Sequence, residues 1–441
     1  SPDKMLAIYF SFFVQFYFFP HLVYNDFNKK QKGIYMKTAA IICEYNPFHN
    51  GHAYHIRETK EKTGADYVIA LMSGNYVQRG TPAIMEKQLR TKMALLNGAD
   101  LVIELPLWSA CSSAPHFAAG SVALLNQLGI VDFLSFGSEC GSIRLLEEIS
   151  DFLTRRHQDL EDLASDYVKL GHSYPKARAL ALHRLAPNPD WIAVAEEPNN
   201  LLGLEYLRAL RESGSSIQPF CVTRQESRHH ESALPAKGSI ASASAVRASI
   251  ETHGTLSDIA SAVPRTVFPL MQEHFQKDFP VCSDDFSLLL KYRILSQPEL
   301  TDYWDVSSDL QASIRKAAGF SCSFTDIVSR CKGKNITWSR ISRSLMHILL
   351  GMTKEHADYL SRHNYRLYYQ ILGFKKSASC VIAAMQEHAS IPMIRHCRPL
   401  KDTLPPDLLP LLSVERRANL IYHTILGEKF HQNWKDRQII V

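Results

Sequence analysis

The residues best suited to chemistry are His49 and His52, which flank Asn50-Gly51 where a first buried strand should pass into a first helix. Gly51 lets the backbone approach a phosphate closely, and the start of a helix points backbone N–H groups at an anion. Two imidazoles beside that turn can donate hydrogen bonds to the α- and β-phosphates of a nucleotide as negative charge builds there. The spacing predicts an ATP site suited to nucleotidyl transfer, and the alternative is a pair of histidines in a surface turn.

A second candidate lies about two hundred residues later, in Ile240–Arg247. Ser242 and Ser244 can cap a helix and leave N–H groups for a phosphate, and Arg247 adds a positive charge one turn into the helix. The segment resembles the ISxTxxR element of HxGH nucleotidyltransferases, with Ser244 in place of the usual threonine. An ordinary serine- and alanine-rich helix start would look the same, so this element depends on the first.

Further polar segments follow predicted strands. Ser73–Pro82 follows the second strand and has polar groups for substrate or RNA, although it also reads as an ordinary loop. Gly137, Asn199 and Arg224 stand near the ends of later elements, where they could reach the nucleotide.

His229-His230-Glu231 is not predicted to bind a metal, because adjacent histidines point apart. The chain has no GxxxxGK[ST] loop, no KMSKS-like stretch, no HExxH and no GxSxG, and no metal site is predicted.

Alternating strand and helix patterns can position these residues. The predicted strands are 38–43, 66–72, 100–105, 132–136 and 217–222, and the predicted helices between them are 51–62, 85–97, 118–128, several within 145–185, and 199–214. This rhythm predicts an α/β fold with a Rossmann-like parallel sheet and helices on both faces. A helix over 242–253 follows. Strand signals fade at a boundary near 260–280, and the rest is predicted to be mostly helical, as in 286–295, 310–318 and 341–350, with 365–372 and 381–385 too short to type.

Charge is unevenly distributed along the 441 residues, whose formal net charge is +5. Residues 331–441 hold 17 lysines and arginines against 8 aspartates and glutamates. A basic region of this kind suits a polyanion, and a solvated helical surface is the alternative. The nine cysteines include no CxxC pair, which argues against a disulfide framework or a zinc ribbon and favours a reducing cytoplasm.

The first 35 residues are interpreted separately. The apolar stretch Leu6–Val23 could be a membrane anchor or a signal segment, but Pro20 and His21 interrupt it and no small-residue cleavage site follows. Because Met36-Lys37 opens a clear strand pattern, we expect Met36 to be the natural start and residues 1–35 to be an upstream extension. No membrane association is predicted.

Several motifs together resemble the bacterial tRNA(Met) cytidine acetate ligases. They are MKTAAIICEYNPFHNGHAYH, MSGNYVQRGTPA, RTKMALLNGADLVIELP, FGSE and PNNLLGLEY, which occur here in the family's order. The resemblance runs from about Met36 to the C-terminus. It implies a nucleotidyltransferase domain over 36–270 and a mostly helical, basic tRNA-binding domain over 271–441. It also implies that acetate and ATP form acetyl-adenylate and pyrophosphate, and that the acetyl group passes to the wobble cytidine of elongator tRNA(Met), giving N(4)-acetylcytidine.

The resemblance also assigns site residues. The ATP-binding segment falls on Ile42, Cys43, Glu44, Tyr45, Asn46, Pro47, Phe48, His49, Asn50, Gly51, His52, Ala53, Tyr54 and His55, and further ATP contacts fall on Gly137, Asn199 and Arg224. His49 and His52 would stabilise the transition state at the α-phosphorus. The basic residues expected to line a tRNA path are Arg340, Arg343, Lys375, Lys376, Arg395, Arg398, Arg416 and Arg417. Nearby Tyr365, Tyr368, Tyr369 and Phe374 could stack a base, but most of them are expected to be core.

Two other functions stay open. One is an HxGH adenylyltransferase or acetate-activating ligase of the citrate lyase ligase type, acting on a small molecule or a protein. The other is a non-catalytic RNA-binding protein with a decayed nucleotide site, which the intact His49, His52 and Arg247 disfavour. Mg²⁺ is expected with ATP, but no carboxylate cluster identifies its ligands. The sequence leaves open the oligomeric state, the selectivity for acetate and the tRNA bases that are read.

Overall fold

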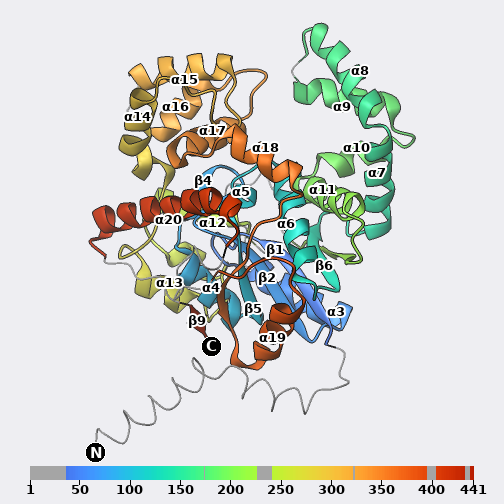
Figure 1. Ribbon diagram of the computed structural model, residues 1–441, viewed down its shortest axis with the longest axis vertical. Coiled ribbons are helices and arrows are strands. Elements are labelled where there is room, and N and C mark those ends of the chain that lie inside the picture. The colour runs from blue at the N-terminus through green and yellow to red at the C-terminus, as the bar shows by residue number, and fades with distance from the viewer. Residues whose placement is uncertain (1–35, 173, 226–240, 321–322, 395–403, 433–437) are drawn as a thin grey trace, which may run out of the picture. The chain divides into compact units, whose positions relative to one another are not determined.

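One seven-stranded sheet organises the protein, in the order β7-β6-β1-β2-β5-β8-β9 (Figure 1). The computed structural model describes residues 36–172, 174–225, 241–320, 323–394, 404–432 and 438–441. The chain divides into two units, Ser1–Lys37 and Thr38–Val441, and everything below concerns the second. The predictions for residues 1–35 and for His229-His230-Glu231 lie outside the described residues.

The five predicted strands are present to within two residues, as β1, β2, β5, β6 and β7, and four further strands were not predicted. Their bounds are β1 Thr38–Cys43, β2 Tyr67–Ser73, β5 Leu101–Leu105, β6 Phe133–Ser138, β7 Gln218–Thr223, β8 Gln370–Phe374 and β9 Ile439–Ile440, and a separate hairpin pairs β3 Tyr76–Val77 with β4 Thr81–Pro82. Strands β7, β6, β1, β2 and β5 run parallel to one another. The central strands are buried along almost their whole length, as expected for a parallel sheet covered on both faces.

Helices between the strands follow the predicted rhythm. They are α3 Asn50–Thr63, α4 Lys87–Leu96, α5 Leu107–Ala110, α6 Ala114–Leu128, α7 Ile143–Arg155, α8 His157–Lys169, α9 Tyr174–Leu185, α10 Asp190–Glu196, α11 Pro198–Glu212 and α12 Ala243–His253. Helix α3 ends at Gly64 and α6 at Gly129, both in the left-handed conformation that favours glycine. The α/β prediction is therefore confirmed.

The region after residue 260 is mostly helical, but it also completes the sheet. Its helices are α13 Phe268–His274, α14 Ser287–Ser296, α15 Ser308–Phe320, α16 Phe324–Cys331, α17 Trp338–Leu350, α18 Lys354–Arg362, α19 Ser379–His388 and α20 Leu409–Phe430. Strand β8 pairs antiparallel with β5, and β9 pairs parallel with β8. The sheet is therefore mixed rather than purely parallel. These two late strands are short, so their periodic signal is weak.

A shared core joins the C-terminal helices to the loops that follow β2 and β5. Tyr76 and Trp108 pack in one cluster with residues of α14–α18 and α20, and the Trp108 indole donates a hydrogen bond to the Leu411 carbonyl at 3.1 Å. Tyr368 and Tyr369 are buried, and Tyr365 is partly buried against the same cluster, so three of the four aromatic residues pack in the core, as expected. Seven cysteines lie in the described ranges and all are free thiols.

Candidate active site

The two histidines lie at the carboxyl edge of the sheet, in the turn between β1 and α3. Strand β1 lies between β2 and β6. The chain builds the sheet from β1 toward β2 and β5, and then crosses to the other side of β1 to form β6. Such a point in an open α/β sheet leaves a crevice that binds ligands. The structure thus puts His49 and His52 where a nucleotide is expected.

The two imidazoles stack on each other and form hydrogen bonds with the backbone at the start of α3. His49 is the N-cap residue: its Nδ1 accepts from the Gly51 N–H at 3.0 Å, and the His49 N–H donates to Nδ1 of His52 at 3.2 Å. The rings stack with centroids 3.7 Å apart. Because each Nδ1 accepts a backbone hydrogen, each neutral ring carries its proton on Nε2. Nε2–H is the group that can donate to a phosphate oxygen.

Burial and nearby arginines keep these rings neutral. Burial, followed by the charges of Arg224 and Arg247, lowers the pKa of His49 to about 3. The pKa of His52 is lowered well below its ordinary value, and that of His55 falls to about 4, in both cases mainly through burial. At neutral pH the site therefore offers neutral N–H donors beside fixed positive charge, an arrangement that favours an anion.

Arg247 connects the second motif to the first. Its Nη1 donates to the Asn46 carbonyl at 2.6 Å and its Nη2 donates to Ser244 Oγ at 3.1 Å. Ser242 caps α12 by accepting from the Ala245 N–H at 3.2 Å. Two segments about two hundred residues apart thus meet at the turn before α3, as the sequence motifs require.

On the β6 side, the other three predicted contacts also come together. Arg224 Nη1 donates to Asn199 Oδ1 at 2.9 Å, and the Arg224 side chain lies against Gly137. The Glu139 carboxylate accepts from the backbone and side-chain N–H groups of Asn199. Buried Asn200 accepts from the Glu139 N–H at 3.0 Å. The segment Pro198-Asn199-Asn200 was expected to reach the nucleotide, whereas Glu139 was given no role, although it stands in the same motif as Gly137.

The rest of the Ile42–His55 segment divides between core and crevice. The side chains of Tyr45, Asn46, Pro47 and Phe48 are buried, whereas Glu44 and the residues from Asn50 to His55 are half-buried. Tyr54 accepts from Gln225 Nε2 at 3.1 Å, and His55 Nε2 lies 3.0 Å from Ser135 Oγ. The segment therefore continues from the end of β1 and contacts β6 and the residues just after β7.

Arg90 is a buried basic residue that the sequence reading missed. Its guanidinium donates to the carbonyls of Met85, Glu44, Ser73 and Gly74. It thereby ties the end of β1 to the end of β2, directly before the histidine turn. The sequence gives little signal for it, because a basic residue on a helix is normally taken for a solvated position, whereas α4 buries Arg90 together with Lys87.

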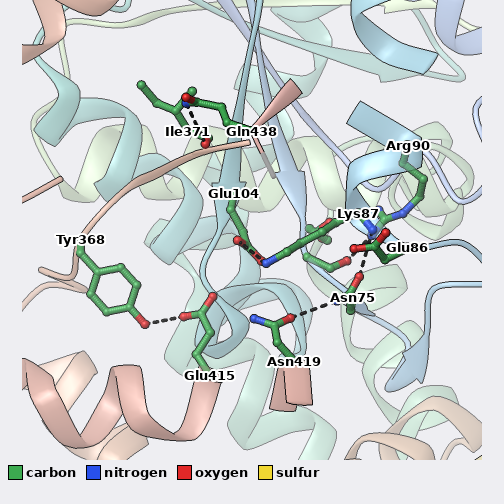
Figure 2. Close-up of polar contacts among 12 residues, drawn as sticks. Asn75, Glu86, Lys87, Arg90, Glu104, Tyr368, Ile371, Glu415, Asn419 and Gln438 are labelled. Carbon is green, nitrogen blue, oxygen red and sulfur yellow. Dashed lines mark hydrogen bonds and ion pairs between the residues drawn. The ribbon is translucent and has the colours of Figure 1, made fainter. Parts of the chain in front are cut away.

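A buried ionic cluster lies further along the same edge (Figure 2). Lys87 Nζ contacts both carboxylate oxygens of Glu104 at 2.8 Å, and Tyr368 donates to Glu415 on α20. Lys87, Glu104 and Glu415 are only 2%, 4% and 6% exposed. Burial and the nearby Glu104 charge raise the pKa of Glu415 to about 7. Lys87 thus contacts Glu104 directly, and its positive charge also favours the ionised form of Glu415 nearby.

The residues predicted to bind tRNA differ in their exposure and in whether they form ion pairs within the protein. Arg340 and Lys376 are exposed. Arg343 forms an ion pair with Asp305 at 3.2 Å, and Lys375 forms one with Asp100 at 3.1 Å. Arg395 and Arg398 lie outside the described residues. Arg416 and Arg417 are both exposed on α20, and Arg417 also donates to the Leu350 carbonyl.

In the part of the chain that the structure describes, no group of three or more His, Cys, Asp or Glu side chains could hold a metal ion. Likewise, none of the described helices is both long and apolar enough to cross a membrane.

Comparison with known proteins agrees with this geometry. The sequence profile of the family described as HIGH Nucleotidyl Transferase matches residues 36–438. A tRNA(Met) cytidine acetate ligase of Acetivibrio thermocellus is 37% identical over 88% of this chain and 94% of its own. That of Caldicellulosiruptor saccharolyticus is 38% identical over 90% and 96%. Crystal structures of Thermotoga maritima TmcAL, apo and bound with alpha-thio ATP, are 27% and 26% identical. Both cover 92% of this chain and 100% of their own, with TM-scores of 0.84 and 0.82.

Proposed function

Because the chain belongs to the tRNA(Met) cytidine acetate ligase family of HIGH nucleotidyl transferases, we infer that it activates acetate with ATP and acetylates elongator tRNA(Met). The acceptor is the N4 amine of the wobble cytidine, and the product is N(4)-acetylcytidine. The observation that carries the chemistry is the pair of stacked, neutral histidines at the start of α3, with Arg224 and Arg247 beside them.

The first step forms acetyl-adenylate. An acetate oxygen, already ionised at neutral pH, attacks the α-phosphorus, and the bond from that phosphorus to the β-phosphate oxygen breaks to release pyrophosphate. His49 and His52 donate from Nε2 to oxygens that gain charge, and the α3 N-terminus adds its dipole. Because both rings are held by backbone hydrogen bonds, they are already oriented before the nucleotide binds.

The β6 side is suited to the nucleoside. Gly137 has no side chain to obstruct a close approach, and Arg224 and Asn199 present polar groups beside it. No group of three or more His, Cys, Asp or Glu side chains among the described residues could hold Mg²⁺, so we expect the ion to be bound mainly through the ATP phosphates. No step is assigned to it.

The second step transfers the acetyl group. The cytidine amine attacks the carbonyl carbon of the adenylate, AMP leaves with the bonding electron pair, and the amine loses a proton. We propose that residues 36–270 form the adenylate and that residues 271–441 bind the tRNA, with exposed Arg340 and Lys376 among its phosphate contacts. Because the acceptor is a tRNA, we expect the enzyme to act in the cytoplasm.

The decisive experiment supplies labelled acetate, ATP and tRNA that lacks the modification, and then identifies the labelled nucleoside. Labelled acetylcytidine in elongator tRNA(Met) is the expected result. Acetate-dependent pyrophosphate release without labelled RNA would keep the adenylation site but move the acceptor to a small molecule or a protein. His52→Ala should abolish the label, whereas His388→Ala, which changes an exposed histidine on α19, should not.

A further inference from the structure

The hairpin that follows β2 presents one arginine to solvent. Between Gly74 and Ala83 every residue is buried except Gln78, Arg79 and Thr81; Gln78 and Thr81 are half-buried, and Arg79 is exposed. The hairpin leaves the carboxyl edge of the sheet beside the histidine turn, since β2 is the neighbour of β1. An arginine at the tip of an otherwise buried hairpin is therefore held close to the adenylation site.

The C-terminal helices fix the base of this hairpin. The Tyr76 hydroxyl donates to the Ala418 carbonyl at 2.9 Å, and Ser342 Oγ donates to the Gly80 carbonyl at 2.7 Å. A side chain at Gly80 would collide with the Arg343 backbone, so α17 packs directly on the turn. The backbone that carries Arg79 is thus immobilised before any ligand arrives, which lowers the entropic cost of using that side chain.

The tip of the hairpin is also tied to the active-site turn. The Gln78 N–H donates to Glu44 Oε1 at 3.0 Å, and Arg90 holds the Glu44 carbonyl at 2.6 Å. Arg79 is close enough to Arg247 for its charge to lower the pKa of that residue. Arg79 therefore lies beside the histidine turn on its β2 side, whereas Gly137 and Arg224 lie on its β6 side.

Arg79 has unused binding capacity. It forms no hydrogen bond or ion pair with any residue in the described ranges, although Arg224 and Arg247 each make hydrogen bonds. A guanidinium carries five N–H donors in a planar fork that fits a carboxylate or a phosphate. The reaction brings a carboxylate up to a triphosphate, so like charges must be screened on both sides of the α-phosphorus.

We propose that Arg79 is a third arginine of the adenylation centre, which binds anionic oxygens of a reactant from the β2 side. The inference rests on the proposed function, because that function supplies the two anions that fit: the carboxylate of acetate and the phosphates that leave as pyrophosphate. Both present paired oxygens to a guanidinium fork, and the kinetics separate them.

The test uses the full-length chain and measures acetate-dependent exchange of labelled pyrophosphate into ATP, without tRNA. Arg79→Ala should raise one Michaelis constant by about 10- to 100-fold, the usual scale for losing a hydrogen bond to a charged group. A rise for acetate alone identifies the carboxylate, and a rise for ATP or pyrophosphate identifies the phosphates. Arg79→Lys should recover part of the loss. Arg155→Ala, which removes an exposed arginine of α7, should change nothing.

Two results would overturn the inference: unchanged constants for acetate, ATP and pyrophosphate in Arg79→Ala, or a defect confined to the tRNA transfer step. The latter would make Arg79 a tRNA contact. An unchanged thermal unfolding midpoint in Arg79→Ala would exclude misfolding as the cause of a loss. If the wild-type chain shows no acetate-dependent exchange, the proposed function itself fails, and this outcome is distinguishable from the others.

Discussion

Replacing Lys87 by methionine should destabilise the protein strongly, and the loss should depend on pH. Lys87 is the cation that contacts both oxygens of Glu104, and Glu415 lies in the same buried cluster. Methionine has a similar length but no charge. The substitution therefore leaves two carboxyl groups buried without their cation, while most of the packing is kept.

The expected magnitude follows from burial. Removing one partner of a buried ion pair costs about 3–5 kcal/mol, and all three side chains are almost fully buried. In the variant, the folded state should relieve the repulsion by taking up an additional proton on one carboxyl. The folded state then binds more protons than the unfolded chain, so the deficit relative to wild type should shrink as pH falls. One carboxyl accounts for about 1.4 kcal/mol per pH unit, or about 3 kcal/mol between pH 8 and pH 6.

Urea unfolding at pH 6, 7 and 8, monitored by circular dichroism, measures both the loss of unfolding free energy and its dependence on pH. Lys60→Met is the matched control, because Lys60 pairs with Asp100 at 3.3 Å but is itself 44% exposed, and Asp100 keeps its ion pair with Lys375. The loss in this control should be below about 1 kcal/mol. Adding Glu104→Gln to Lys87→Met should recover part of the loss. A large loss that stays constant with pH would refute the reasoning, since it would mean that methionine packs badly rather than that a charge is unpaired.

Three further predictions concern the active site and the tRNA path. His52→Ala should abolish pyrophosphate release and leave tRNA binding nearly unchanged; equal loss of both in a filter-binding assay would make the histidine structural. Since the pKa of His49 is about 3 and that of His55 about 4, the unfolded chain binds more protons below pH 6.5. Unfolding free energy should therefore fall as pH drops from 6.5 towards 4, by up to about 1.4 kcal/mol per unit for each ring. Chemical denaturation of His49→Asn and His55→Asn variants should show a shallower dependence, and an unchanged one would contradict the assignment. Arg340→Ala and Lys376→Ala should each reduce the slope of log affinity for tRNA against log salt by about 1; an unchanged slope would remove that residue from the phosphate contacts.

Sequence reasoning predicts the central sheet well because its signals are local. Each of the five parallel strands was predicted from a short local segment, and helix α6 ends at Gly129, directly after the predicted helix 118–128. Strands β8 and β9 gave no comparable signal. They span five and two residues. Strand β8 forms on the open edge of β5, more than 250 residues earlier in the chain, and β9 in turn pairs with β8. A short segment whose conformation depends on a distant partner cannot be typed from its own periodicity.

The same distinction applies to the site. His49, His52 and Arg247 stand in motifs whose spacing reflects the chemistry, so they could be predicted. Arg90 and Lys87 could not, because a basic residue on a helix normally faces water. Here the loops after β1 and β2 supply the carbonyls for Arg90, and β5 supplies the carboxylate for Lys87.

The late strands have a consequence for dissecting the protein. Strand β8 covers the outer edge of β5, and Lys375 just beyond it binds Asp100. A chain truncated after residue 270 would keep every nucleotide-site residue predicted here, yet it would expose the whole hydrogen-bonding edge of an apolar strand. Unprotected edges of this kind template pairing between molecules. We therefore expect the isolated front part to aggregate, and a soluble minimal enzyme to require the last residues of the chain.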